Sequence, residues 1–365
     1  MACDLSIAAG AMKGYTSSDV KGGGLPTVTR QEKPIARTLI ETIVRKALRD
    51  IQDDPERSMR NLVDMAQEFA KGRFQQHFFR AAQKMLQNDA SPYYSLVRDV
   101  SAHVEHERLL SFGMNLGYNG CTLGAKKIRY MEEKEGFHIP WSITLHMPHA
   151  LEKDQLIDYQ RLIAQGEALG VYVWFLFARN APESILPLAA AHPDSAFVLF
   201  LPSGNAGAKL LEEAGEAHNV MLAIRFSEKA MDLMADLREK KLLYASYQYY
   251  SDETAPDILS GNAIKAMQQF APVSVFVALP DLSESIEQQV YQYVSYSRHE
   301  QLYRTLLWEY ALDNRFVDTV ISGDACSAAF TSEGTLCTQK KTPSAPDMNF
   351  HDAALAAILK RAFPQ

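Results

Sequence analysis

The chain has 365 residues, 47% hydrophobic and 22% charged, an ordinary globular composition with room for one large α/β domain plus an accessory region, or for two domains. Its formal net charge of −7 argues against a general nucleic-acid surface, which needs clustered Lys and Arg. No apolar run reaches the roughly 20 residues of a membrane helix, the start lacks a signal-peptide pattern, and four cysteines do not make a disulfide framework. We therefore expect a cytoplasmic protein without a membrane span.

The first hundred or so residues divide into an arm and a helical stretch. Residues 1–35 are rich in Gly, Ser, Thr and Lys and predict a flexible arm, because they bury too little apolar surface to offset chain entropy. From 36 to 136, apolar residues recur at three- and four-residue steps, which is typical of amphipathic helices. One helix should begin at Asp54-Pro55-Glu56, with an N-cap, a first-turn proline and an acid. Further helices are expected over about 74–88 and 93–116.

Two features of this helical stretch look like ligand sites, but we interpret both as structural. His103 and His106 are three residues apart, as a metal pair would be, yet no third ligand is identifiable, which favours a polar helix face. Four glycines between residues 113 and 124 follow a helix, whereas a phosphate-binding glycine loop follows a strand. They indicate close helix packing or a turn.

After residue 140 the pattern changes to apolar runs separated by helical segments. The runs predict strands at 142–146, 171–177, 196–201, 220–226, 242–249, 273–279 and 305–309. Helices are expected between most of them, at about 153–168, 205–217, 227–240, 256–271 and 282–297. Such alternation indicates a parallel sheet. A repeat of roughly 22 to 31 residues, without a glycine-rich first turn, favours a TIM-barrel-like (β/α) barrel or part-barrel over an open doubly wound sheet.

The C-terminal region predicts a small hairpin and a final helix. Two short strands should flank the turn that ends in Gly334, with this glycine at positive φ and with Phe330 and Leu336 facing the core. An amphipathic helix is expected over 352–363. The predicted organisation is therefore an arm (1–35), an α-helical subdomain (36–136), a part-barrel (137–320), and a hairpin plus helix (321–365).

The order and spacing of three segments resemble a group of radical SAM proteins with a long helical N-terminus. These segments are Asp53–Glu56 with the helix that follows, Gly136–Leu145 at the entry to the first barrel strand, and Cys326–Cys337 near the end of the barrel. The resemblance spans about residues 36–363 and implies a radical-SAM-like part-barrel. It also implies S-adenosylmethionine and a [4Fe–4S] iron-sulfur cluster on three cysteines after the first strand.

The sequence departs from that family at both cofactor motifs. The residues that correspond to the cluster loop, 147–159, contain His149 but no cysteine, and a cluster needs thiolates. The family's second strand ends in a Gly-Gly-Glu-Pro-like turn against the cofactor's amino group, whereas the segment Ala178–Glu183 keeps the proline and neither glycine. We therefore expect a degenerate member, a pseudoenzyme that acts as a non-catalytic binding or partner protein, with a related radical SAM enzyme as a natural partner.

Two alternatives stay open. One is an enzyme that uses a polar pocket at the barrel mouth for a non-radical reaction on a small polar or anionic metabolite. The other is a family member with an atypical cluster on the remaining cysteines, for which the metal candidates are Cys326, Cys337 and Cys121. We interpret Cys326 and Cys337 as remnants of a lost site, without a catalytic role, because an auxiliary cluster would need further cysteines.

If the part-barrel binds a ligand, its site should lie at the carboxyl ends of the strands. The strand 245–250 is unusually polar and aromatic, which suits a small polar ligand, and two arginines would suit an anion. The candidate pocket residues are His146, His149, Arg179, Asn180, Ser203, Asn205, Arg225, Tyr247, Gln248, Asp281 and Glu309.

Overall fold

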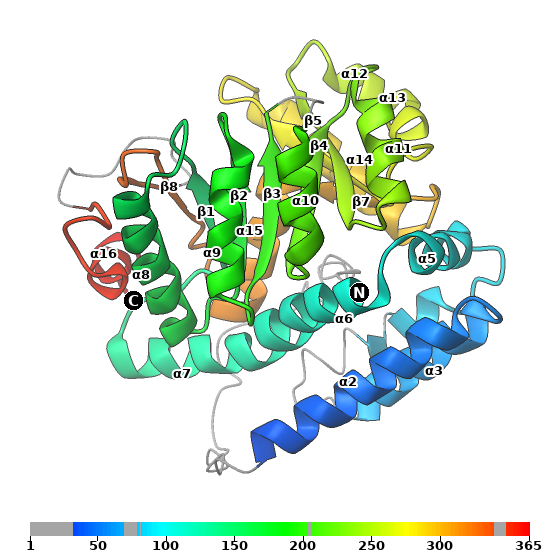
Figure 1. The fold of residues 1–365 in the computed structure, drawn as a ribbon, viewed down its shortest axis with the longest axis horizontal. Helices are drawn as coiled ribbons and strands as arrows, with labels where there is room; N and C mark the ends of the chain where they lie inside the picture. Colours follow the sequence, from blue (N-terminus) through cyan, green and yellow to red (C-terminus); the bar gives the residue numbers. More distant parts are fainter. Residues whose placement is uncertain (1–31, 69–78, 81, 203–205, 339–347) are drawn as a thin grey trace.

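The structure, a computed structural model, describes residues 32–68, 79–80, 82–202, 206–338 and 348–365 (Figure 1). Several predicted features lie outside these residues. They are most of the arm, most of the N-terminal half of the predicted helix 74–88, and the candidate pocket residues Ser203 and Asn205. Within them, every helix is too short or too polar to span a bilayer.

A nine-stranded sheet forms the centre of the molecule, with the strand order β7-β6-β5-β4-β3-β2-β1-β8-β9. All neighbouring strands pair in parallel except β8 and β9, which form an antiparallel hairpin. The strands are β1 (Ser142–His146), β2 (Val173–Phe177), β3 (Ala196–Leu201), β4 (Val220–Arg225), β5 (Tyr244–Tyr250), β6 (Val273–Ala278), β7 (Leu306–Glu309), β8 (Ala328–Phe330) and β9 (Leu336–Cys337). Because β1 to β7 follow one another without a switch in order and the sheet is curled, the predicted α/β part-barrel is confirmed.

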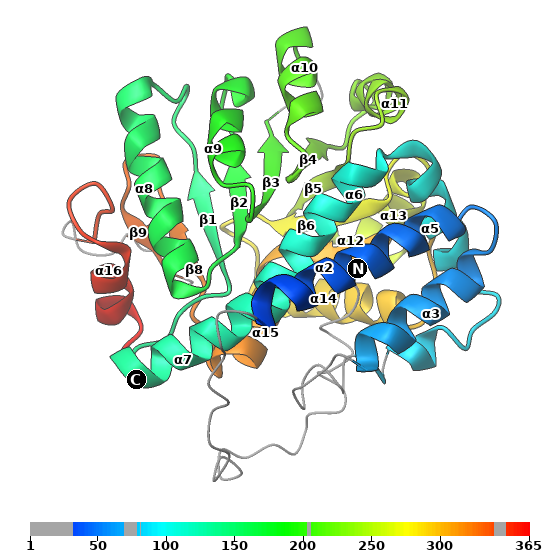
Figure 2. The same ribbon diagram turned by 60° about the horizontal axis from the view of Figure 1, so that its bottom comes forward.

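Helices cover the outer face of the sheet between successive strands (Figures 1 and 2). They are α8 (Lys153–Leu169), η2 (Pro182–Ile185), α9 (Leu186–Ala191), α10 (Ala208–Glu216), α11 (Ala230–Glu239), α12 (Ala255–Leu259), α13 (Asn262–Met267) and α14 (Glu284–His299). α15 (Tyr310–Ser322) connects β7 to β8 and lies on the opposite, concave side of the sheet, where the Tyr310 ring packs against Phe175. Alternate strand residues face these helices, as for Trp174, whose ring would meet a Cβ added to Gly166 of α8. The predicted helix over 256–271 is two short helices, because Gly261 adopts φ 78° between them.

The N-terminal helices are α2 (Glu32–Asp50), α3 (Pro55–Glu68), α5 (Pro92–His103), α6 (His106–Gly113), η1 (Met114–Gly124) and α7 (Ala125–Glu135). The prediction of one helix over 93–116 is wrong, because α5 ends at His103 and α6 begins at His106. The chain is extended at Val104, where the backbone N–H of Glu105 donates to the Lys241 carbonyl before β5. His103 and His106 consequently lie on different helices.

The α6, η1 and α7 helices run along the amino-terminal edge of the sheet (Figure 2). Asn115 donates to the carbonyls of Pro193 and Ser195 before β3, at 2.8 and 2.9 Å. Arg108 donates to the carbonyls of Ala214, Gly215 and Ala217 before β4. These bonds satisfy buried carbonyls at one end of the part-barrel. The carboxyl-terminal edge, where ligand sites form, is the opposite end.

The predicted close packing of the glycine series is found at its end. η1 is an 11-residue π-helix, and a Cβ added to Gly124 would overlap the backbone oxygen of Gly170, which precedes β2. A side chain at this position would push the helix away from the sheet.

The C-terminal hairpin forms as predicted. Gly334 has φ 85°, and the side chains of Phe330 and Leu336 are fully buried. β8 pairs in parallel with β1, with Leu145 opposite Phe330, so the hairpin extends the sheet beyond its first strand. The final helix, α16 (Leu355–Ala362), packs on α8. This pairing places the hairpin turn at the carboxyl-terminal edge of the part-barrel.

Candidate functional site

A cavity of about 460 Å³ lies at the carboxyl ends of the strands, and we call it the mouth cavity. Each of β1 to β5 supplies at least one residue from its carboxyl-terminal half or from just beyond its end, and the turn of the β8–β9 hairpin lines one side. Its lining residues are His146, Phe177, Ala178, Arg179, Phe200, Pro202, Arg225, Tyr247, Tyr249, Thr331, Ser332 and Glu333. This volume lies within the range of small-molecule sites in proteins.

Aromatic rings from the concave face of the sheet form one wall of the mouth cavity. Phe177 stacks on Phe200 with ring centroids 4.2 Å apart, and Tyr247 meets Phe200 edge-on at 5.1 Å. On the same concave face, Tyr310 of α15 packs edge-on against Phe175, Phe177 and Phe200. The Tyr310 hydroxyl lies 2.5 Å from the Thr144 hydroxyl. The interior of the part-barrel is therefore filled, and a ligand can occupy the mouth alone.

Tyr247 is held in place by its hydroxyl, which donates to the carbonyl of Leu201 at 2.7 Å. Burial raises the pKa of this hydroxyl, so the side chain stays neutral. The ring is consequently a fixed hydrogen-bonded wall of the cavity and not a ready proton donor.

Two guanidinium groups and one carboxylate set the charge of the mouth cavity. Arg179 and Arg225 are exposed at its rim, and Glu333 lies across from them on the hairpin turn. Hydrogen bonds from Ser332 and Thr331 lower the pKa of Glu333, which holds the carboxylate charged. Partial burial, and then the charge of Arg179, lower the pKa of His146, which favours a neutral imidazole. The net charge of the cavity is positive and suits a small anion.

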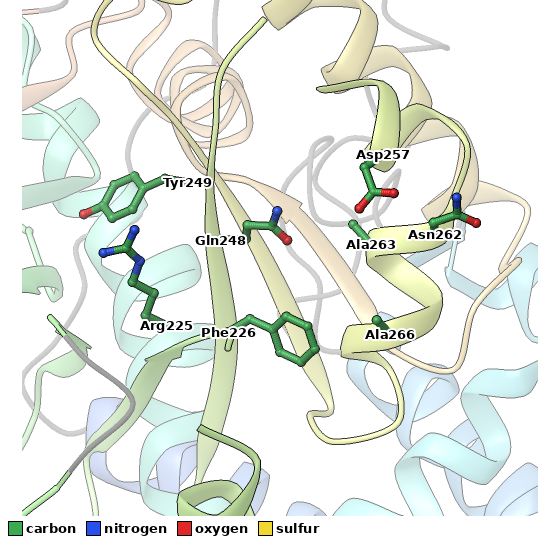
Figure 3. A pocket seen from close by; sticks show the side chains of 8 residues that line it. All are labelled: Arg225, Phe226, Gln248, Tyr249, Asp257, Asn262, Ala263 and Ala266. Atoms are coloured by element: carbon green, nitrogen blue, oxygen red, sulfur yellow. The ribbon is translucent and has the colours of Figure 1, made fainter. Parts of the chain in front are cut away.

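Arg225 lies at the junction of the mouth cavity with a second one. Its guanidinium is 5.3 Å from the ring centroid of Tyr249, a cation–π contact, and among the described residues it forms no ion pair. The second cavity, of about 550 Å³, lies between the β4–β5 rim and helices α12 and α13, and we call it the outer groove (Figure 3). Its lining residues are Arg225, Phe226, Gln248, Tyr249, Asp257, Asn262, Ala263 and Ala266.

The structure brings four of the candidate residues together in the mouth cavity, namely His146, Arg179, Arg225 and Tyr247. Gln248 lies in the outer groove, because consecutive strand residues point to opposite faces of the sheet. The other described candidates line neither cavity. His149 and Asn180 bond to each other at 2.9 Å, and Asp281 is exposed after β6.

Glu309, the last candidate, is fully buried and serves a structural role. Its carboxyl group accepts the hydroxyl of Tyr250 at 2.9 Å and caps α15 by accepting the N–H of Leu312 at 2.6 Å. Beside it, Asp313 forms a buried two-bond ion pair with Arg298. Burial raises the pKa of Glu309 to about 8.

Several lining residues were missed by sequence reasoning. Tyr249 shares a face with Tyr247, and the strand period of two would have identified it. Thr331, Ser332 and Glu333 gave no local signal, because the pairing of β8 with β1 joins segments nearly 190 positions apart, as between Leu145 and Phe330.

The residues after β1 do not fit an iron–sulfur cluster of the family type. The segment 147–152 offers the buried thioether of Met147 and the imidazole of His149, and a cluster needs thiolates. Cys326 is buried and donates to Ser322, Cys337 is half-buried on β9, and Cys121 lies in η1. Among the described residues, no three His, Cys, Asp or Glu side chains form a group that could hold a metal.

Comparison with known proteins finds similarity to solved structures. No protein-family model matches the chain, and no curated protein matches it. Streptococcus suis SuiB bound to S-adenosylmethionine aligns with a TM-score of 0.47 and 10% identity, over 65% of this chain and 67% of SuiB. SuiB bound to precursor peptide SuiA gives 0.46 and 9%, over 65% and 68%. The anSMEcpe structure with bound AdoMet gives 0.41 and 9%, over 60% and 77%.

SuiB and anSMEcpe are radical SAM enzymes with a half-barrel sheet. At about 10% identity and TM-scores below 0.5, the similarity concerns the course of the chain and does not extend to ligands or activity.

Proposed function

We propose that this chain is a radical-SAM-like protein that has lost the SAM-cleaving cluster and acts as a non-catalytic binding or partner protein. The observation that carries the proposal is the combination found at the carboxyl end of β1. His146 lines a cavity fit for a small ligand, while the segment that follows it, 147–159, contains no thiolate donor.

The proposed ligand is a small polar or anionic molecule in the mouth cavity. Arg179 and Arg225 supply two guanidinium groups that suit a carboxylate or phosphate. The stacked rings of Phe177 and Phe200 supply an apolar wall for the body of the ligand. Tyr247 offers no free hydroxyl hydrogen, because it donates to Leu201.

Anaerobic treatment with iron and sulfide, followed by visible spectroscopy and an assay for S-adenosylmethionine cleavage, tests the loss of the cluster. We expect no stoichiometric cluster and no cleavage. A stoichiometric cluster with cleavage of S-adenosylmethionine would refute the proposal, and it would favour the atypical-cluster alternative.

Thermal unfolding with a panel of small carboxylates and phosphates tests the binding role. A ligand at one hundred times its Kd should stabilise the protein by about 2.7 kcal/mol. Arg179→Ala should weaken binding of a hit at least about tenfold, because a hydrogen bond to a charged group contributes about 1.5–3 kcal/mol. Arg57→Ala, at an exposed position on α3, is the matched control. Turnover of a hit would show a non-radical enzyme instead, and the absence of any hit would leave no support for a ligand role.

We further propose a companion radical SAM enzyme as the protein partner, acting with this chain in the cytoplasm. Sedimentation of the chain with such a purified enzyme should show a faster-moving complex, and unchanged sedimentation at micromolar concentrations would argue against this partner.

A further inference from the structure

The outer groove has a different chemistry from the mouth cavity. Its base is apolar, formed by the ring of Phe226 and by Ala263 and Ala266 of α13. The backbone N–H of Phe226 donates to the Tyr247 carbonyl at 2.8 Å, and its ring packs 6.3 Å from Phe270. This bracing holds a flat aromatic surface in place, and such a surface favours a planar ring as its ligand.

Three polar side chains stand around this apolar base. Gln248 projects from β5, and Asp257 and Asn262 project from α12 and α13 on the other side (Figure 3). In the part of the chain that the structure describes, none of the three side chains has a hydrogen-bond partner. The two carboxamides can both donate and accept, whereas the Asp257 carboxylate only accepts. Together they match a ring edge that presents an amine beside ring nitrogen or carbonyl acceptors.

The cation of the outer groove lies at its far end. Arg225 and Tyr249 stand on the opposite side of β5 from Asp257 (Figure 3). The guanidinium is exposed and lies over the Tyr249 ring, a geometry that leaves its N–H edge available for an anion. The groove therefore holds an acceptor for an amine on one side of β5 and a cation on the other, with the ring of Phe226 as an apolar surface beside them.

We propose that the outer groove is a second ligand site, which binds a nucleoside monophosphate whose base carries an exocyclic amine. The base lies on Phe226, its amine donates to Asp257, its ring acceptors take hydrogen bonds from Gln248 and Asn262, and its phosphate pairs with Arg225. The groove volume of about 550 Å³ lies within the range of sites for ligands of this size. This site is distinct from the ligand role of the mouth cavity, although Arg225 and Tyr249 border both.

Calorimetric titration of the full chain with cytidine 5′-monophosphate tests the proposal, with uridine 5′-monophosphate as the matched ligand. The uridine compound replaces the amine by a carbonyl, which would face the Asp257 carboxylate. We expect cytidine 5′-monophosphate to bind at least tenfold more tightly. Equal affinities, tighter binding of the uridine compound, or no binding at millimolar concentration would overturn the proposal.

Variants locate the bound nucleotide. Asp257→Asn should remove most of the preference for the cytidine compound, and Arg225→Ala should weaken both nucleotides at least tenfold. Asp281→Asn, at an exposed position outside both cavities, should change neither affinity. Arg179→Ala, which alters the mouth cavity alone, should also leave them unchanged. Loss of nucleotide binding in Arg179→Ala with full binding in Asp257→Asn would place the nucleotide in the mouth cavity and overturn the proposal. Thermal unfolding of each variant checks that it is folded.

Discussion

Replacing Glu309 by glutamine should remove a large part of the pH dependence of stability. The carboxyl group is fully buried, and its two oxygens accept bonds from the Tyr250 hydroxyl and the Leu312 backbone. Those bonds favour the charged form, yet burial outweighs them, and the nearby Asp313 carboxylate adds to the effect. The pKa consequently rises from the ordinary value of 4.5 to about 8.

The sign of the effect follows from which state holds the proton. Between pH 4.5 and about 8, the folded chain keeps a proton on Glu309 that the unfolded chain has released. The free energy of unfolding therefore falls as the pH rises, by about 1.4 kcal/mol per pH unit for this one group. Over two units inside this window, Glu309 alone contributes a loss of roughly 2–3 kcal/mol. The Glu309→Gln variant has no such proton and should lose correspondingly less.

Urea unfolding of the wild type and of Glu309→Gln at pH 5, 6 and 7 measures the two slopes. Glu253→Gln, at an exposed position, is the matched control and should follow the wild type. Asp318→Asn should flatten the slope in the same direction, because burial raises the pKa of Asp318 to about 7. A Glu309→Gln slope equal to that of the wild type would show that the carboxyl group is charged in the folded state and would refute the reasoning.

Further predictions concern the glycine contact and the cysteines. Gly124→Ala should destabilise the protein by about 1–3 kcal/mol, because the added Cβ would overlap the backbone oxygen of Gly170. Gly113→Ala is the control and should be neutral or slightly stabilising, because the space around its Cβ is open. Denaturant unfolding measures the free energy of unfolding of both variants. Cys326→Ser with Cys337→Ser should leave the zinc and iron content unchanged and near zero by elemental analysis. Near-stoichiometric metal that disappears in the double variant would show a working metal site.

The strands were predictable because their signal is local. A parallel strand that is buried on both faces is a continuous apolar run, as in β3, whose bounds coincide with the predicted run 196–201. The helix break at Val104 was not predictable, because the apolar period continues through it. The break depends on a backbone bond from Glu105 to Lys241, a contact between segments far apart in the sequence. Local patterns indicate what an element is, and tertiary contacts decide where it ends.

The site was predictable to the extent that it depends on strand ends. The topology rule placed Arg179, Arg225 and Tyr247 at the carboxyl-terminal edge, and they line the mouth cavity. The same rule could not predict that Tyr247 lines the mouth cavity and Gln248 the outer groove. It predicts which end of a strand carries the site, but not which side chains face the concave side of the sheet. Nor could it place Glu333, which reaches the mouth through the pairing of β8 with β1.

The alternation of strand residues also explains why two cavities share one cation. Arg225 ends β4 on the concave face, opposite Tyr247 in register, and the next residue, Phe226, turns to the outer face. A guanidinium at the last position of a strand can reach over the rim to either side. An anion bound in the mouth cavity and a phosphate bound in the outer groove would therefore compete for Arg225. Because coupling between two binding sites is reciprocal, each ligand should weaken the other by the same factor.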